Sequence, residues 1–416
     1  MDVFDRKIIG YESIKKELRM IADTLIDPDK YAQHGITPVK GILLVGVPGT
    51  GKSTLARCFA DYTRKPAIVL RKTMEGPEFL KEIVDSFEEA KQNGGILILE
   101  DLDKFSSEHS STAPEWATLQ SAIDDHKDDG VFLLATLNNA AYIPSSLLRA
   151  GRFDLTFDIS VPTGKVSQQI IEHYLADAPL GPDVDLNEIA RIMQDRSCSE
   201  LEAVVKQAEC SRIYEDREAI ERKHLIDAAL KIGFHFSFSD QIEDKEYRDY
   251  VALHESGHIV AAECCWPESF VFATVAADQK HDGVTFIVGE PDNAEDLLKK
   301  AIINLGGLAA VEVVLGEVGL GSSQDIRTAG DLLAEYYVDN GSAGFLFPDL
   351  EDYQISGDLK ARLEHTISAK LGELMSEARK IMVQNYCHLL DIRNELSERG
   401  ILTYRDLQNL CERKEN

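Results

Sequence analysis

The sequence predicts an α/β domain with a parallel sheet flanked by helices, then a small helical lid and a mainly α-helical domain. From 40 to 164, apolar runs such as "GILLVG", "GILILE" and "VFLLATL" alternate with helix-like stretches, as in a parallel sheet covered by helices. Residues 166–232 have the pattern of short helices broken at "APLGPDVD". Helical periodicity then dominates, as in "DLLKKAIINLGGLAAVEVVL".

These patterns define the expected domain boundaries. We expect the α/β domain over 1–165, the lid over 166–235, a linker over 236–245 and the helical domain over 246–416. The linker is indicated by "GFHFSFSDQIEDKEY", where the composition changes to aromatic residues, serine and charge. A chain of 416 residues is long enough for such a division, because single cores rarely grow beyond about 250 to 300 residues.

Charge and hydropathy exclude several classes of protein. The formal net charge of -28 would repel phosphate backbones, and no lysine and arginine cluster offsets it, so nucleic-acid binding is not expected. No apolar run approaches the roughly 20 residues of a membrane helix, and "MDVFDRKIIG" lacks the layout of a signal peptide. We therefore expect a cytoplasmic protein without direct membrane insertion. Its seven cysteines contain no CxxC pair and are expected to be reduced.

The segment "GVPGTGKS" predicts a phosphate-binding loop. It fits GxxxxGK[ST], follows the apolar strand "ILLV" and opens a helix-like stretch, as this chemistry requires. Its glycines let backbone N–H groups turn toward phosphates, Lys52 adds a positive charge, and Ser53 offers a hydroxyl to Mg²⁺. ATP and Mg²⁺ are the expected ligands, held by Gly46, Val47, Pro48, Gly49, Thr50, Gly51, Lys52, Ser53 and Thr54.

Polar residues after later strands complete this predicted site. In "GILILEDLDKF", Glu100 would hold Mg²⁺ through water and Asp101 would orient the attacking water. Asn138, one of the polar residues at the end of the strand "VFLLATLNN", could contact the γ-phosphate or that water. Arg149 and Arg152 in "SSLLRAGRFD" could stabilise charge on the γ-phosphate of a neighbouring subunit.

The segment "LHESGHIV" predicts a metal site. On a helix, His254 and His258 share a face and can bind one Zn²⁺, while Glu255 takes a proton from bound water. A catalytic zinc needs a third protein ligand. A metzincin-type extension is excluded, because Ala261 and Cys264 occupy the positions that would need glycine and histidine. The side chains chemically able to complete the site are Asp278, His281, Glu312 and Asp325, and spacing does not choose among them.

The order of these parts resembles the FtsH family of ATP-dependent AAA+ zinc proteases. The resemblance covers nearly the whole chain and includes "GVPGTGKS", "ATLNN", "LLRAGRFD", "HESGH", "DGVTFIV", "NLGGLAA" and "SSQDIRTA". It implies that Asp325 is the third zinc ligand, with Glu312 as runner-up. It also implies a homohexameric ring in which Arg149 and Arg152 reach the nucleotide of the next subunit. Unfolded or tagged proteins would be pulled through its pore to the zinc sites.

Three departures from the family pattern modify these expectations. Members normally begin with membrane helices, which we expect this chain to lack. The pore segment normally offers an aromatic, an aliphatic and a glycine, whereas this chain has Met74, Glu75 and Gly76. The usual Asp-Glu pair after the second strand is reversed to Glu100-Asp101, and Tyr174 occupies the position expected for a lid histidine. The reversed pair predicts slow ATP hydrolysis.

Three functions fit the sequence. The first is an ATP-dependent zinc endopeptidase acting on unfolded or tagged proteins. The second is a zinc peptidase whose nucleotide domain mainly assembles and gates it, with slow ATP hydrolysis. The third is a remodelling scaffold with a vestigial peptidase, against which the retention of all four expected residues argues: His254, Glu255, His258 and Asp325.

Overall fold

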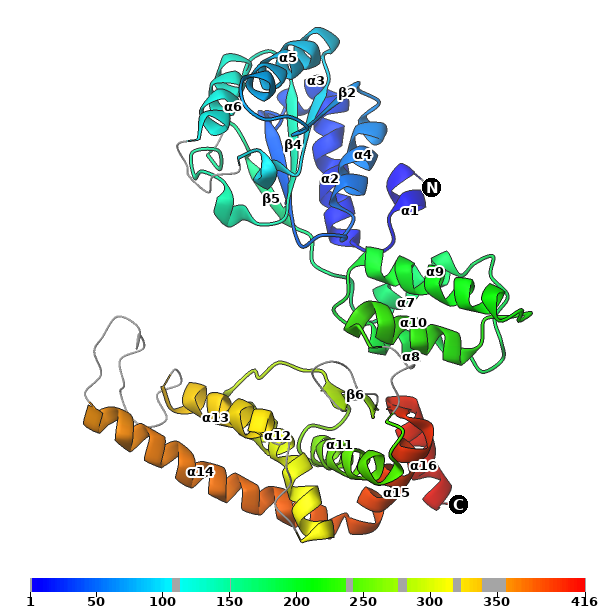
Figure 1. Ribbon diagram of the computed structural model, residues 1–416. Coiled ribbons are helices and arrows are strands. Elements are labelled where there is room, and N and C mark those ends of the chain that lie inside the picture. Colours follow the sequence, from blue (N-terminus) through cyan, green and yellow to red (C-terminus); the bar gives the residue numbers. More distant parts are fainter. Residues whose placement is uncertain are drawn as a thin grey trace. The chain divides into compact units, whose positions relative to one another are not determined.

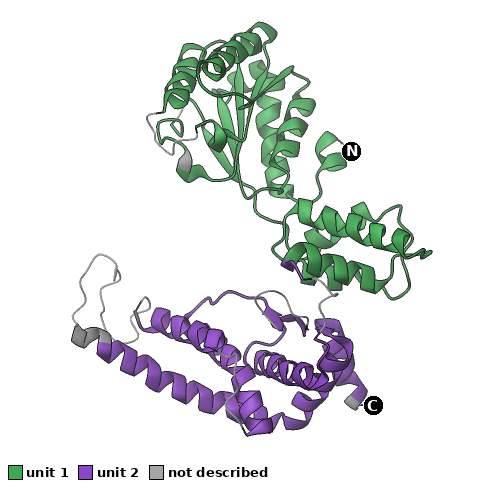
Figure 2. Ribbon diagram, viewed as in Figure 1, with its two compact units in different colours: residues 1–233 green, residues 234–416 purple. Residues whose placement is uncertain are grey.

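The computed structural model describes residues 2–106, 113–149, 151–236, 242–275, 283–316, 323–338 and 357–415. It divides into two compact units, Met1–Gly233 and Phe234–Asn416 (Figure 2). The change of unit lies just before the predicted linker. The boundary between the α/β domain and the lid falls inside the first unit and stays a prediction.

The first unit is built on a five-stranded parallel sheet with strand order β2-β3-β4-β1-β5. Its central strands β1, β3 and β4 are almost entirely buried, which explains their continuous apolar sequences. The α/β prediction is therefore confirmed. The strands are β1 (Gly41–Val45), β2 (Ala67–Arg71), β3 (Ile96–Glu100), β4 (Phe132–Leu137) and β5 (Leu155–Asp158).

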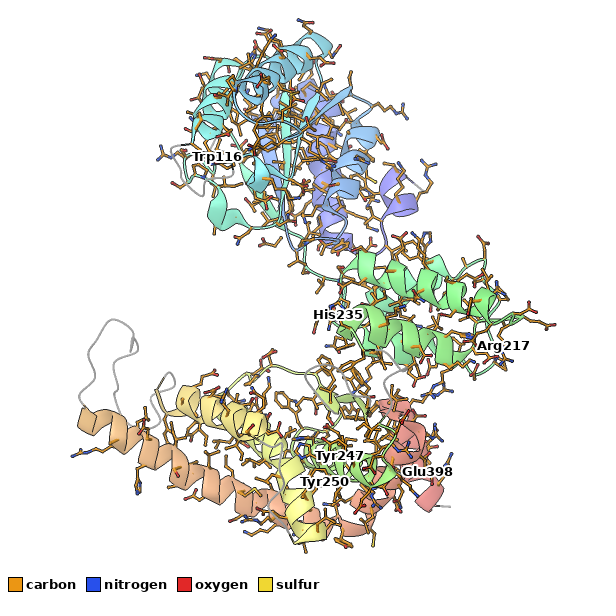
Figure 3. All side chains as sticks on the ribbon, in the orientation of Figure 1. Trp116, Arg217, His235, Tyr247, Tyr250 and Glu398 are labelled. Carbon is orange, nitrogen blue, oxygen red and sulfur yellow. The ribbon has the colours of Figure 1, made fainter. Side chains whose placement is uncertain are left out.

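Helices cover both faces of this sheet (Figure 1). Successive residues of a strand point to opposite faces, so Leu43 packs in the core beneath α5 and α6, while Ile42 packs beneath α1, α2 and α4. Trp116 of α6 is fully buried in the first of these cores (Figure 3). The helices are α1 (Val3–Lys7), α2 (Glu12–Ile26), α3 (Pro28–Ala32), α4 (Lys52–Thr63), α5 (Pro77–Asn93) and α6 (Pro114–Asp125), and two 3-10 turns lie at η1 (Leu102–Lys104) and η2 (Ala140–Tyr142).

The residues of the predicted lid contain four helices, in agreement with the several helices expected there. Helix α9 begins with a capping box, in which the Ser197 side chain accepts from the Glu200 N–H and the Glu200 carboxylate accepts from the Ser197 N–H. This cap satisfies backbone donors that the first helical turn would otherwise leave without partners. The four helices are α7 (Lys165–Tyr174), α8 (Leu186–Ile192), α9 (Cys198–Tyr214) and α10 (Arg222–Phe234).

The second unit is mainly helical, as predicted, with a small antiparallel sheet of order β7-β6-β8. None of the helices in the described ranges combines the length and apolar character that a membrane crossing requires. The helices are α11 (Lys245–Cys265), α12 (Ala294–Leu315), α13 (Ser323–Val338), α14 (Gly357–Gln384), α15 (Tyr386–Arg399) and α16 (Tyr404–Glu415), and the strands are β6 (Phe270–Thr274), β7 (Val284–Ile287) and β8 (Ile401–Thr403).

Two glycines allow α11 and α12 to cross at close range. A Cβ added to Gly257 would lie 2.2 Å from the Gly306 carbonyl oxygen, and one added to Gly306 would lie 2.5 Å from the Gly257 carbonyl oxygen. Any side chain at either position would therefore push the helices apart. The close crossing brings the backbone of α12 against the histidines of α11.

Candidate functional site

The phosphate-binding loop connects β1 to α4. Gly51 precedes the helix with φ of 91°, a conformation that favours glycine, and caps it without a side-chain hydrogen bond. The first N–H groups of this 12-residue helix therefore keep their capacity to bind an anion. Ser53 and Thr54 follow in its first turn. The local geometry is that expected for the motif.

Lys52 is held at the mouth of this loop by three oxygen atoms. Its Nζ donates to the carbonyl oxygens of Gly46 at 2.8 Å and Val47 at 3.0 Å, and to Asn138 Oδ1 at 3.0 Å. Burial lowers the pKa of the Lys52 ammonium. The structure thus brings Asn138, predicted from the end of another strand, into contact with the lysine of the loop.

Glu100 is engaged away from this lysine network. Its carboxylate is 2% exposed and pairs with Arg57 of α4 at 3.1 Å and with Arg71 at the end of β2 at 2.5 Å. Both arginine side chains are more than half exposed, so each guanidinium could exchange its partner for solvent or a ligand. For Glu100 to reach a magnesium ion, at least one of these pairs must change.

Two other acids of "LEDLD" act on Lys52. The charges of Asp101 and Asp103 oppose the effect of burial on the Lys52 pKa. Asp103 Oδ2 accepts from Asn138 Nδ2 at 3.3 Å, which extends the chain from Lys52 through Asn138 to a carboxylate. Asp101 has a left-handed backbone conformation and pairs with Lys104 at 2.9 Å. Sequence reasoning missed Asp103, although it stands two residues after Asp101.

The two predicted arginines have different surroundings. Arg152 makes a two-pronged pair with Asp124, at 3.1 and 2.7 Å, and its third nitrogen donates to the Ser146 carbonyl oxygen at 2.6 Å. This pairing lowers the pKa of Asp124. Arg149 is exposed, and no ion pair to it is found within the described residues. Arg149 is therefore the more accessible of the two side chains.

The lid contacts the phosphate loop directly. The Ser199 N–H at the start of α9 donates to the Gly49 carbonyl oxygen at 3.1 Å, and a Cβ on Gly49 would lie 2.0 Å from Ser199 Oγ. Tyr11 donates to the carbonyl oxygens of Thr50 at 3.3 Å and Ser160 at 2.8 Å. These contacts couple the loop to the lid and to the N-terminal segment. Sequence reasoning had identified neither Tyr11 nor Ser199.

The predicted metal ligands converge in the second unit. His254 Nε2 lies 3.1 Å from His258 Nε2 and 3.1 Å from Asp325 Oδ2, and the distance from His258 Nε2 to the same oxygen is 3.7 Å. Helix α11 supplies the histidines and the first turn of α13 supplies the aspartate. Two imidazole nitrogens and a carboxylate oxygen are a donor set of catalytic zinc sites. The residues present therefore fit a zinc ion.

The orientation of His258 is fixed by α12. Its Nδ1 donates to the Ile303 carbonyl oxygen at 2.7 Å, which leaves Nε2 for the metal side. Burial by itself would lower the pKa of His258. The carboxylates of Asp325 and Glu255 have the larger, opposite effect, and the pKa is raised to about 9. Burial likewise raises the pKa of Asp325, while the two histidines bring it below its ordinary range. The cluster is thus arranged to hold positive charge.

Glu255 is buried beside these ligands, with 6% of its surface exposed. Thr285 on β7 donates from Oγ1 to Glu255 Oε2 at 2.7 Å. A Cβ on Gly283 would lie 2.9 Å from Glu255 Oε1, so the bare glycine leaves room for that second oxygen. The role of Thr285 was missed, although it lies in the quoted segment "DGVTFIV".

Two of the four candidates for a third ligand, Asp325 and Glu312, are distinguished by position. Asp325 lies at the histidines, whereas Glu312 Oε2 accepts from Arg379 Nε at 2.6 Å. Asp278 and His281 lie outside the described residues. Among the described residues, the grouping of metal-binding side chains at this site consists of His254, His258 and Asp325.

Comparisons with known protein families give one match within each of the two units. Residues 42–161 match the ATPase family associated with various cellular activities (AAA), and residues 241–410 match peptidase family M41. ATP-dependent zinc metalloprotease FtsH of Caldicellulosiruptor bescii is 25% identical over 97% of this chain and 71% of its own length. FtsH 2 of Symbiobacterium thermophilum is 27% identical, over 97% of this chain and 73% of its own length. FtsH of Thermobaculum terrenum is 28% identical, over 97% of this chain and 65% of its own length.

Proposed function

We propose that this chain, which belongs to the FtsH-type AAA zinc metalloproteases, unfolds, translocates and degrades proteins as a hexameric ring. The observation that supports this proposal is that the chain contains both a phosphate-binding loop and a set of zinc-binding side chains. One unit contains the phosphate loop with Lys52 bound to Asn138, and the other contains His254, His258 and Asp325 within 3.7 Å of one another. ATP, Mg²⁺ and one Zn²⁺ per subunit are the implied cofactors.

In the peptidase site, a zinc ion held by His254, His258 and Asp325 would polarise the scissile carbonyl and lower the pKa of water to about 7. Glu255 then accepts the proton of the attacking water and delivers it to the leaving amine. Thr285 occupies Oε2 of Glu255, which leaves Oε1 as the oxygen for this transfer. Burial of Glu255 excludes bulk water from the carboxylate.

In the ATPase site, backbone N–H groups at the start of α4 and the Lys52 ammonium bind the phosphates. Asp101 orients the attacking water, and Asn138, held by Asp103, contacts the γ-phosphate.

Glu100 would bind Mg²⁺ through water only after releasing Arg57 or Arg71. That requirement supports slow hydrolysis and favours, as a second candidate, a peptidase whose nucleotide domain mainly assembles and gates it.

The hexameric ring is proposed from the arginine following β4. The exposed side chain of Arg149 is available to the nucleotide of a neighbouring subunit, whereas Arg152 positions its segment through Asp124. Met74, in the proposed pore segment, is 47% exposed and could contact a translocating polypeptide. Unfolded or tagged proteins are the proposed substrates.

One experiment separates the candidates. Degradation of an unfolded protein is measured with ATP, with a non-hydrolysable analogue and with a chelator, using the native chain and Glu255→Gln. We expect degradation with ATP, little with the analogue, and none with the chelator or in Glu255→Gln. Equal degradation with ATP and the analogue would favour the gated peptidase, and remodelling without any cleavage would favour a scaffold.

A further inference from the structure

A second group of metal-binding side chains lies elsewhere in the peptidase unit. Glu263 of α11, His388 of α15 and Cys411 of α16 each offer one ligand atom, and these atoms all lie within 4.8 Å of one another. His388 Nε2 is 3.0 Å from Glu263 Oε2. All three residues are half-buried. Helix α11 packs against α15, and α16 lies at the same end of the unit (Figure 1).

The donor set favours zinc. Imidazole nitrogen, carboxylate oxygen and thiolate sulfur all bind Zn²⁺, whereas a thiolate argues against the hard cations Mg²⁺ and Ca²⁺. With tetrahedral zinc bonds of about 2.0 to 2.3 Å, ligand atoms stand roughly 3.3 to 3.8 Å apart. The observed cluster therefore needs only small side-chain movements to close on an ion. An ion pair between Glu263 and His388 alone would not require Cys411 beside it.

An adjacent cavity offers a fourth ligand. It has a volume of about 360 Å³ and opens beside Glu263 and Cys411. Its other polar lining residues are Glu268, Tyr404, Gln408 and Glu412. A water molecule or one of these two carboxylates can complete a tetrahedral site. The cavity also provides the route by which the ion enters.

We propose that Glu263, His388 and Cys411 form a second, structural zinc site in this chain. The ion joins α15 and α16 to α11, the helix that carries His254 and His258. Glu263 lies five residues after His258 on the same helix, so the second ion anchors the C-terminal end of the catalytic helix. Because its ligands are on three helices, the site stabilises their packing rather than one local segment.

Cobalt distinguishes the two sites, because only the second contains sulfur. The full chain, stripped with a chelator and kept reduced, is titrated with Co²⁺ and followed in the near ultraviolet, where thiolate-to-cobalt charge transfer absorbs. We expect two equivalents and a thiolate band in the native chain. Cys411→Ser and His388→Gln should each lose the band and one equivalent. His258→Ala should keep the band and lose the other equivalent.

Cys387→Ser is the matched control, since Cys387 is an exposed cysteine adjacent to His388 and lies outside the cluster. It should behave as the native chain does. Circular dichroism establishes that each variant is folded before titration. Protection of Cys411 from alkylation by added zinc, with Cys387 still reactive, provides a second measurement. A native chain without the band, or a band that survives in Cys411→Ser, would overturn the proposal.

Discussion

Gly307 of α12 lies directly against the imidazole of His258. A Cβ at Gly307 would stand 2.6 Å from His258 Nε2 and 2.5 Å from His254 Cε1, closer than real Cβ atoms approach other heavy atoms. Both atoms belong to the proposed metal-binding rings. The absence of a side chain on α12 is therefore a condition for the ligand geometry on α11.

Replacing Gly307 by alanine should displace the two imidazoles and reduce zinc content and peptidase activity together. Gly330→Ala is the matched control, because this glycine of α13 has nothing within 4 Å of an added Cβ. That control should keep its zinc and gain up to about 1 kcal/mol of stability from better helix propensity. Zinc is measured by metal analysis of the purified chains. A fully loaded Gly307→Ala would contradict the geometric argument.

Asp325→Ala should remove most zinc and most peptidase activity, because it deletes the carboxylate beside both histidines. Glu312→Ala should keep its zinc, since Glu312 pairs with Arg379 instead. Metal analysis and peptide cleavage are measured on both variants. Loss of zinc in Glu312→Ala with retention in Asp325→Ala would move the third ligand to Glu312.

Thr285→Val should lower kcat by roughly 10- to 150-fold with zinc retained, because a hydrogen bond to a charged group contributes roughly 1.5 to 3 kcal/mol. The change leaves the Glu255 carboxylate in place but without its positioning donor. Thr285→Ser, which keeps the hydroxyl, should restore most of the rate. Steady-state peptide cleavage gives kcat and KM separately. Equal activity of the valine and serine variants would show that the hydroxyl does not position Glu255.

The metal-free chain should lose stability as the pH rises from 6.5 through about 9. Over that range His258, whose pKa is raised from 6.5 to about 9, gives up the proton that its carboxylate neighbours stabilise in the folded state. The stabilisation is fully present below pH 6.5. Zinc replaces the proton, so the loaded chain should not show this loss. Urea unfolding at several pH values measures this loss. In metal-free Asp325→Asn, the free energy of unfolding should depend less on pH over the same range.

Asp101→Asn should bind ATP but not hydrolyse it, because Lys52 and Ser53 are intact while the water-orienting carboxylate is lost.

The exchange of both acids, Glu100→Asp with Asp101→Glu, should hydrolyse ATP faster than the native chain if the reversed pair misplaces each carboxylate. Rapid native turnover that falls on exchange would show instead that the pairs with Arg57 and Arg71 have rebuilt the site around Glu100. Nucleotide binding and phosphate release are measured on each variant.

The parallel sheet, the phosphate loop and the pair of histidines can be predicted from the sequence, because each depends on residues that are close together in the chain. Apolar runs specify buried strands, and GxxxxGK[ST] specifies a loop whose backbone binds phosphate. His254 and His258 share a helical face through their spacing alone. These features follow from local periodicity and bond geometry.

The residues that contact these motifs from distant parts of the chain become apparent only from the folded structure. Asp325 is 71 positions from His254, and Arg71 reaches Glu100 across neighbouring strands. Gly307 and Thr285 act through the packing of α12 and β7 against α11, which no local pattern encodes. Contacts of this kind depend on how whole elements pack. A carboxylate able to bind zinc therefore looks the same in sequence whether it lies beside the two histidines, as Asp325 does, or pairs with an arginine, as Glu312 does.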